Sequence, residues 1–245
     1  MVSVKKSIEN YNYAHASQII SEMLIHPLDK SLRKTLIEAN QICQAFDLWD
    51  KFQHQKALEL LIPYGARFSS YIVVVKKILG MKGSTDYEVV GDLLNNAERK
   101  AHQKYYDDAV ARLYRATELF AQIRLEREYK YKSGDLKLTD LPEDLRDEYK
   151  SHVREGGKLI LGLREDYELL YKLGDPLGYK FKEREEKILN GLTRRNLSIG
   201  AHGLKPLSEE DYLLVKNALK DFILDTSKEI RIDLQIPQLP QRGIL

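Results

Sequence analysis

An arginine and a histidine in this sequence occupy positions where an amphipathic helix would ordinarily carry leucine. Steps of three and four residues connect Ile188, Leu192, Arg195, Ile199 and His202 into one helical stripe. If the segment is helical, Arg195 and His202 lie about 20° out of register and roughly 10 Å apart along the axis, so both face the same pocket or partner. Histidine exchanges protons near neutral pH and arginine keeps a permanent charge, so the pair suits acid–base chemistry at a charged group.

The same stripe also permits a purely structural interpretation. A histidine on an apolar stripe is often a hydrogen-bonded core residue, and an arginine near it can simply pair with a carboxylate. The spacing alone is loose, because Arg146 and His152 show it as well. Those two residues would stand about 120° apart on a helix, and they belong to a charged run without an apolar stripe. We interpret that second pair as part of a solvated surface.

Two further lines of residues accompany the pair. Beside the stripe, Arg194 and Ser198 alternate with the small residues Gly191 and Ala201, which lets another backbone or a substrate approach closely.

The stretch 104–131 has the most regular helical pattern, and Arg115, Glu118 and Gln122 form a polar line beside its apolar face. This line is interpreted either as an intrahelical salt bridge, contributing about 0.3 kcal/mol, or as the border of the Arg195/His202 pocket.

Composition excludes several other classes of protein. The chain has 245 residues, of which 39 are basic and 37 acidic, and the net charge of +2 argues against coating long stretches of duplex by charge alone. Cys43 is the single cysteine, which excludes an internal disulfide framework and every cysteine-cluster zinc site. The six histidines are scattered, so no metal site is expected. We also expect no signal peptide, no membrane span and a cytoplasmic location.

Hydrophobic periodicity predicts an all-α protein, a multi-helix bundle. Ser208 with Asp211 predicts a capping box at the start of the last helix. Beyond that helix, alternating apolar residues over 230–236 predict a short strand or a tail. A boundary at the glycines near Ser84 divides an N-terminal helical region, 1–83, from a C-terminal helical domain, 84–245. The helices are expected near 11–25, 31–48, 51–62, 66–79, 85–101, 104–131, 143–151, 156–173, 181–199 and 209–228.

At this point the sequence resembles a known family. The segment Arg195-Asn196-x-Ser198-x-x-Ala201-His202-Gly203 is similar to the signature of HEPN ribonucleases, an arginine followed by a polar residue and, four to six residues later, a histidine. The segment from Tyr105 to Glu118 resembles the first long helix of the HEPN domain in type III CRISPR-associated accessory nucleases. Further similar phrases lie at 46–52 and 173–176, and the resemblance spans residues 11–212.

The resemblance implies a HEPN-like helical core in a homodimer, with the two motifs meeting across the interface, and metal-independent cleavage of single-stranded RNA without a cofactor. On that hypothesis, the 2′-hydroxyl of RNA is the nucleophile, His202 transfers protons and Arg195 stabilises the phosphorane-like transition state. Asn196 positions the phosphate or the imidazole. Other residues lie along the RNA path or support the site: Arg194, Ser198, Lys205, Arg115 and Glu118.

Alternatives from other classes remain open at this stage. A HEPN-like domain can bind RNA or a nucleotide without cleaving it or act as a toxin-type module, and a helical scaffold can recruit another protein. Relatives usually carry an N-terminal Rossmann-type domain that senses cyclic oligoadenylate, and the alternation of strands and helices that such a domain needs is missing here. We therefore expect any regulation by cyclic oligoadenylate only through a domain missing from this sequence.

Overall fold

The protein is all-α, as the periodicity predicted. The computed structural model describes residues 1–154, 156–196 and 205–245, and the side chains of 194–196 also lie outside the described part. In the described part it contains helices, turns and isolated bridges, and no sheet. The helices are α1 (Val2–Glu9), α2 (Tyr13–Ile25), α3 (Lys30–Asp50), α4 (His54–Leu61), α5 (Gly65–Ile78), α6 (Glu88–His102), α7 (Tyr106–Tyr129), α8 (Glu143–Tyr149), α9 (Leu163–Lys172), α10 (Pro176–Asn196) and α11 (Glu209–Glu229).

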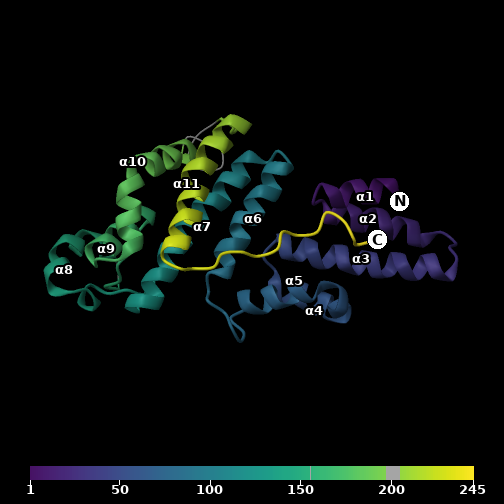
Figure 1. Ribbon diagram of the computed structural model, residues 1–245, viewed down its shortest axis with the longest axis horizontal. Coiled ribbons are helices and arrows are strands. Elements are labelled where there is room, and N and C mark those ends of the chain that lie inside the picture. The colour runs from purple at the N-terminus through teal and green to yellow at the C-terminus, as the bar shows by residue number, and fades with distance from the viewer. Residues whose placement is uncertain (155, 197–204) are drawn as a thin grey trace. The chain divides into compact units, whose positions relative to one another are not determined.

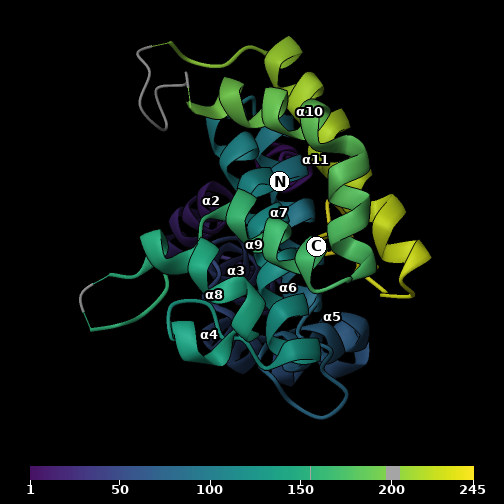
Figure 2. The ribbon, with the colours of Figure 1, turned by 90° about the vertical axis from the view of Figure 1, so that its left-hand side faces the viewer.

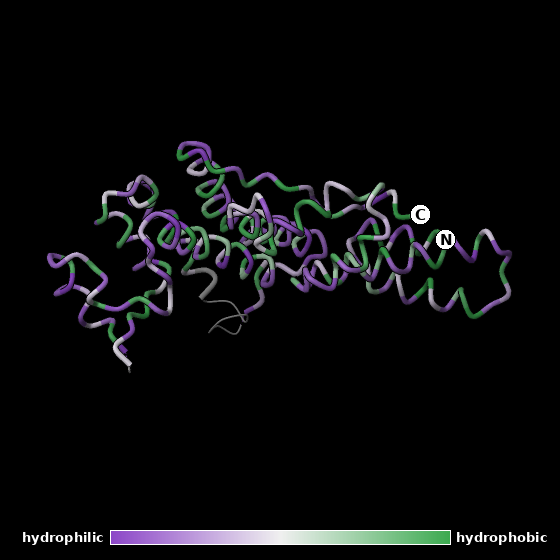
Figure 3. Tube along the Cα trace, turned by 90° about the horizontal axis from the view of Figure 1, so that it is seen from below, coloured by the Kyte–Doolittle hydropathy of each residue, from purple (hydrophilic) through white to green (hydrophobic). Residues whose placement is uncertain are grey.

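Hydrophilic and hydrophobic residues alternate along the helices (Figure 3), the pattern of amphipathic helices that bury one face. Contacts group the chain into two compact units: unit 1 comprises 1–105 with 235–245, and unit 2 comprises 106–234. The division expected between residues 83 and 84, into an N-terminal helical region and a C-terminal helical domain, stays a prediction.

Unit 1 is a set of helical hairpins around an aromatic and aliphatic core, with α2 packed on α3 and α3 on α4. A polar network lies inside this core. The Arg99 side chain is fully buried and donates from Nε to Asp50 Oδ1 at 2.7 Å. Asp92 accepts hydrogen bonds from Trp49 Nε1 at 3.0 Å and pairs with His54 Nε2 at 2.9 Å. Because each buried charge has a partner, the network joins α3, α4 and α6 without a stranded charge.

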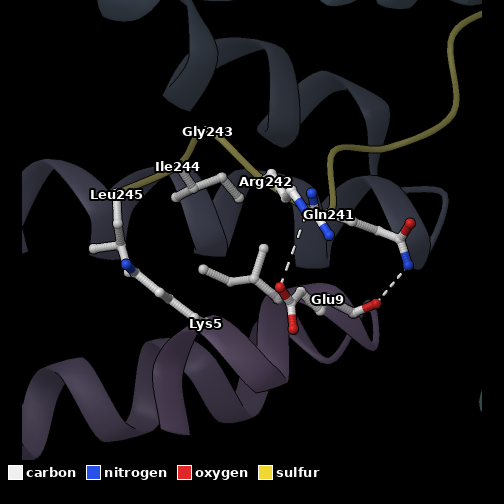
Figure 4. A pocket seen from close by; sticks show the side chains of 8 residues that line it. Lys5, Glu9, Gln241, Arg242, Gly243, Ile244 and Leu245 are labelled. Atoms are coloured by element: carbon white, nitrogen blue, oxygen red, sulfur yellow. Dashed lines mark hydrogen bonds and ion pairs between the residues drawn. The ribbon is translucent and has the colours of Figure 1, made fainter. Parts of the chain in front are cut away.

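The C-terminal segment is a tail of unit 1, so the short strand considered for 230–236 is wrong. After α11 the chain forms no strand: the Ile230 and Ile232 N–H groups bond back to carbonyls of α11, and the Ile236 carbonyl accepts from the Asn95 side chain. Tyr13 Oη donates to the Pro240 carbonyl at 2.9 Å, and Arg99 Nη1 donates to Gln238 Oε1 at 2.6 Å. At the end of the tail, Gln241 Nε2 donates to the Glu9 carbonyl at 2.5 Å (Figure 4).

Unit 2 is built on the long helix α7, against which α9, α10 and α11 pack (Figures 1 and 2). Its core contains stacked Tyr167 and Phe181 rings with centroids 4.3 Å apart. The helix expected over 156–173 begins only at Leu163, because Gly156 and Gly157 adopt positive φ and the preceding segment forms an isolated bridge between Val153 and Leu159 instead.

The helical stretch His54–Ile78 is long and apolar enough to cross a membrane by length and composition, contrary to the expectation that no segment would be. This is weak evidence for a membrane span, because core helices of soluble proteins pass the same test. The stretch is also interrupted: Phe68 has non-helical dihedral angles, and its side chain packs into the core of unit 1.

The fold makes Gly178 indispensable to the packing of α10 on the end of α9. A Cβ at this position would lie 2.1 Å from the Tyr171 backbone nitrogen. We therefore predict that Gly178→Ala lowers the free energy of unfolding by about 2 kcal/mol or more, since backbone must move. The control is Gly65→Ala, where the nearest atom would be an ordinary 3.8 Å away. Equal stability of the two variants in urea titrations would contradict this packing.

Candidate functional site

The helix that carries the arginine motif is fixed at its beginning by a buried carboxylate. Asp175 Oδ1 accepts from the Leu177 backbone N–H at 2.8 Å, in the first turn of α10. Its other oxygen accepts from Arg124 Nε at 2.8 Å and from Tyr129 Oη at 3.1 Å, both on α7. Asp175 therefore caps α10 and ties it to α7.

Close packing then fixes the course of α10 beside α11, and the two helices run side by side (Figures 1 and 2). The apolar stripe is buried at Ile188 and Leu192, as predicted. Gly191, on the line of small residues, faces α11, and a Cβ there would lie 3.4 Å from the Ala218 Cβ. The neighbour of this glycine is therefore α11, and the expected close approach of another backbone or a substrate stays a prediction, because a Cβ would meet only ordinary contacts.

The candidate site residues lie at the end of this helix and beyond it. Arg194, Arg195 and Asn196 belong to the last turn of α10, where the helix register continues from Ile188 and Leu192 to Arg195. Their side chains lie outside the described part of the chain, as do Ser198 and His202 entirely. Lys205 is described and exposed. The arrangement of these residues around a common site thus stays a prediction.

The chain re-enters the described part next to α7, and a second carboxylate holds it there. Asp107 Oδ2, in the first turn of α7, accepts from the Leu207 backbone N–H at 3.1 Å. The predicted capping box follows at once: Ser208 Oγ accepts from the Asp211 N–H at 3.2 Å. The Tyr106 and Tyr212 rings stack 6.0 Å apart beside it. The segment 197–204 is therefore bounded by α10 on one side and by this anchor on the other.

The polar line of α7 forms the intrahelical contacts that were considered for it. Arg115 Nη1 pairs with Glu118 Oε2 at 2.5 Å and donates to Gln122 Oε1 at 3.0 Å. Gln122 Nε2 lies 3.4 Å from Asp166 Oδ2 on α9, so the line continues onto a second helix. A role of Arg115 and Glu118 in orienting Arg195 and His202 involves side chains outside the described part and stays a prediction.

Asp166 is a buried carboxylic acid that keeps its proton at higher pH than an exposed aspartate does. Its side chain is 1% exposed beside the apolar residues of α7 and α9. Burial raises the pKa of Asp166 to about 8, the Gln122 hydrogen bond opposes the shift, and nearby Glu118 adds to it. The carboxyl group is thus mostly neutral at pH 7 and can donate as well as accept a hydrogen bond.

Sequence reasoning missed three carboxylates that organise the helices of unit 2, namely Asp107, Asp166 and Asp175. Asp175 carried a local signal, because an aspartate just before the proline that opens a helix is an N-cap pattern. Asp107 and Asp166 carried none, since their partners lie 100 and 44 residues away in sequence. Among the described residues, no three His, Cys, Asp or Glu side chains gather in a way that could hold a metal ion.

The described part of the chain is an all-α protein in which the helix α10 carries the arginine motif in its last turn. A family model described as the Csm6 HEPN domain matches residues 82–226, which is more than half of the chain and includes both Arg195 and His202. The chain therefore belongs to this family, and it is a CRISPR-associated HEPN module of the type III group. No curated protein matched the chain.

The anchor at Asp107 gives a test with a built-in control. Asp107→Ala leaves the Leu207 N–H without its acceptor, so we predict a loss of about 1 kcal/mol in the free energy of unfolding. Asp108→Ala removes the neighbouring charge from the same first turn of α7 without touching Leu207. Amide hydrogen exchange at Leu207 should quicken in the first variant alone; equal exchange in both would contradict the anchor.

The buried Asp166 predicts a particular pH dependence of stability. The pKa of Asp166 is about 8 in the folded protein, so the folded state keeps a proton on this group that the unfolded chain releases above about pH 4. The contribution of Asp166 to the free energy of unfolding is therefore full below pH 4 and declines as the pH rises to about 8. Relative to the wild type, Asp166→Asn should gain stability progressively over this range, as measured by urea unfolding at several pH values. A difference in the free energy of unfolding between the two proteins that stays constant with pH would contradict the raised pKa of Asp166.

Proposed function

We propose that the protein is a metal-independent endoribonuclease that cleaves single-stranded RNA in CRISPR antiviral defence. The observation that carries the proposal is the family match, which spans Arg195 and His202. Members of HEPN families typically act on RNA as dimers, and a cytoplasmic location would give such an enzyme its substrate. Two carboxylates that hold the elements on either side of the motif segment support it: Asp175 caps the first turn of α10, and Asp107 accepts from the Leu207 N–H.

The proposed reaction uses the substrate's own nucleophile. The 2′-hydroxyl oxygen attacks the adjacent phosphorus, the bond from phosphorus to the 5′ oxygen breaks, and the products carry a 2′,3′-cyclic phosphate and a 5′-hydroxyl. One proton leaves the 2′-hydroxyl and one is added to the departing 5′ oxygen. His202 performs such a transfer, for which an unperturbed pKa of about 6.5 is well suited.

The other residues are assigned by charge and position. Arg195 offers a planar, permanently charged fork to the phosphorane-like transition state, a role that lysine fills less well. Asn196 positions the phosphate or the imidazole ring, and Arg194 and Ser198 lie along the RNA path. The exposed Lys205 attracts the phosphate backbone.

A homodimer completes the proposal, because the reaction needs both a base and an acid and each chain contributes one His202. Two copies related by a twofold axis would bring two imidazoles to one composite site.

One alternative, also compatible with the family match, is a non-catalytic module that binds RNA or a nucleotide, or acts as a toxin. In a second alternative the protein is a helical scaffold, and Arg195 and His202 have purely structural roles.

The decisive comparison is cleavage of labelled single-stranded RNA in EDTA by the wild type, Arg195→Ala and His202→Ala. We predict a loss of about 10²-fold or more in rate for each variant, the range typical of lost acid–base catalysis or transition-state charge stabilisation.

Asn190→Ala, an exposed position on the same helix, is the control and should cleave at the wild-type rate. Equal cleavage by all four proteins would refute the proposal, and tight binding without products would favour the non-catalytic alternative.

A further inference from the structure

Unit 1 contains a polar cavity that the proposed reaction does not use. It has a volume of about 470 Å³ and lies where three segments meet: the turn between α1 and α2, the end of α3, and the turn after α6. Gln103 Nε2 donates to the Asn10 carbonyl at 3.0 Å, which holds two of these turns together. The lining residues are Asn10–Ala14, Asp47, Asp50, Lys51, Lys100 and His102–Tyr105.

The cavity has more positive charge than its carboxylates neutralise. Asp47 pairs with Lys51 at 2.7 Å. Asp50 pairs with both Arg99 and Lys100, each at 2.7 Å. The exposed Lys104 ammonium has no carboxylate partner among the residues that the structure describes. An anion entering the cavity therefore meets an unneutralised cation at the rim, with two paired lysines close by.

Aromatic rings stand next to this free cation. The Tyr105 side chain is 59% exposed although it is large and apolar over most of its surface. The Tyr11 ring, which also lines the cavity, meets the exposed His102 ring edge to face, with centroids 5.4 Å apart. Flat rings beside lysines and side-chain amides are the combination that binds splayed nucleotides, because bases stack on the rings and phosphates meet the cations.

The backbone at the rim adds a separate observation. Tyr11 and Lys104 adopt left-handed φ angles of 55° and 64° where their helices end. The turn after α6 has the hydrogen bonds of a Schellman motif, from Lys104 N–H to Ala101 O at 2.9 Å and from Tyr105 N–H to Lys100 O at 2.8 Å. Glycine is the residue that fits such a position without strain. The sequence instead keeps a lysine there, directly beside the exposed tyrosine.

We propose that this cavity is an auxiliary binding site for one nucleotide of single-stranded RNA, with the base on Tyr105 and the phosphate at Lys104. The inference rests on the proposed function in that it takes RNA as the ligand. It assigns no chemistry to the cavity: the site holds a part of the strand other than the part at Arg195 and His202, and so strengthens binding of long substrates.

The test measures binding without cleavage, by fluorescence anisotropy of a labelled oligouridylate in a His202→Ala background. Tyr105→Ala should weaken binding by roughly 5- to 100-fold, the range for loss of one stacked base, and Tyr105→Phe should restore it. Lys104→Gly should lower affinity and reduce the slope of log affinity against log salt by about 1, while leaving thermal stability unchanged or raised.

Lys34→Ala is the charge-matched control. It lies near the opposite end of α3, about 24 Å along the helix from the cavity, and its side chain is 80% exposed. Ultraviolet crosslinking of the same RNA should label the peptide that contains Tyr105.

The outcomes separate this inference from the proposed function. If the wild type fails to cleave RNA but Tyr105→Ala and Lys104→Gly still weaken binding, the ribonuclease proposal fails and the auxiliary site stands. If the wild type cleaves RNA while both variants bind as tightly as the Lys34→Ala control, the auxiliary site is refuted and the ribonuclease proposal stands.

Discussion

The carboxylate of Asp175 is the interaction on which the motif-bearing part of this protein depends. It caps the first turn of α10 and accepts hydrogen bonds from Arg124 and Tyr129 of α7. Being 1% exposed, it acts where water does not compete, so these charge-assisted bonds are strong and directional. A helix fixed at its start and packed tightly along its length delivers its last turn to a defined place, and that turn carries Arg195.

Unit 1 also depends on a buried carboxylate, in this case one that pairs with cations inside its core. Its core contains the buried Arg99, which donates hydrogen bonds to Asp50 of α3 and to Gln238 of the C-terminal tail. Asp50 also binds Lys100 at the edge of the polar cavity, so one carboxylate serves both the core and the cavity wall. Ion pairs and hydrogen bonds thus hold the walls of the cavity together, while the two residues proposed to meet the RNA, Lys104 and Tyr105, stay exposed at its rim. Rigid support with exposed contact groups is what a binding site requires.

Much of the fold could be predicted from the sequence, because helix signals are local. The apolar repeat located α7 and α11 to within two residues, and Ser208 with Asp211 gave the start of α11. Predictions failed where local signals gave way to tertiary contacts. The alternating residues after α11 suggested a strand, but the Ile230 and Ile232 N–H groups bond back to carbonyls of α11, and the Ile236 carbonyl accepts from the Asn95 side chain. The short helix α1 was missed because its eight residues hold few apolar positions, of which Val4 and Ile8 are buried.

The motif could be picked out from the sequence pattern, whereas the carboxylates of the surrounding helices could not. Arg195 and His202 stood out because they replace apolar residues on one stripe, a pattern visible within a few helical turns. The carboxylates that hold the helices of unit 2 were not visible in this way. Asp107 meets its partner across 100 residues of sequence, and Asp166 has its pKa raised by burial that depends on the packing of α7 and α9. Residues of this kind become identifiable only once the helices are placed in space.

The central claim is that the substrate itself supplies the nucleophile, and a chemically modified RNA tests it most directly. In an oligonucleotide with a single cleavable linkage, replacing the 2′-hydroxyl next to that linkage by hydrogen should abolish cleavage while leaving binding nearly unchanged. The unmodified strand should yield a 2′,3′-cyclic phosphate and a 5′-hydroxyl, identifiable by mass spectrometry. Cleavage of the 2′-deoxy linkage at the normal rate, or products ending in a 5′-phosphate, would contradict the account.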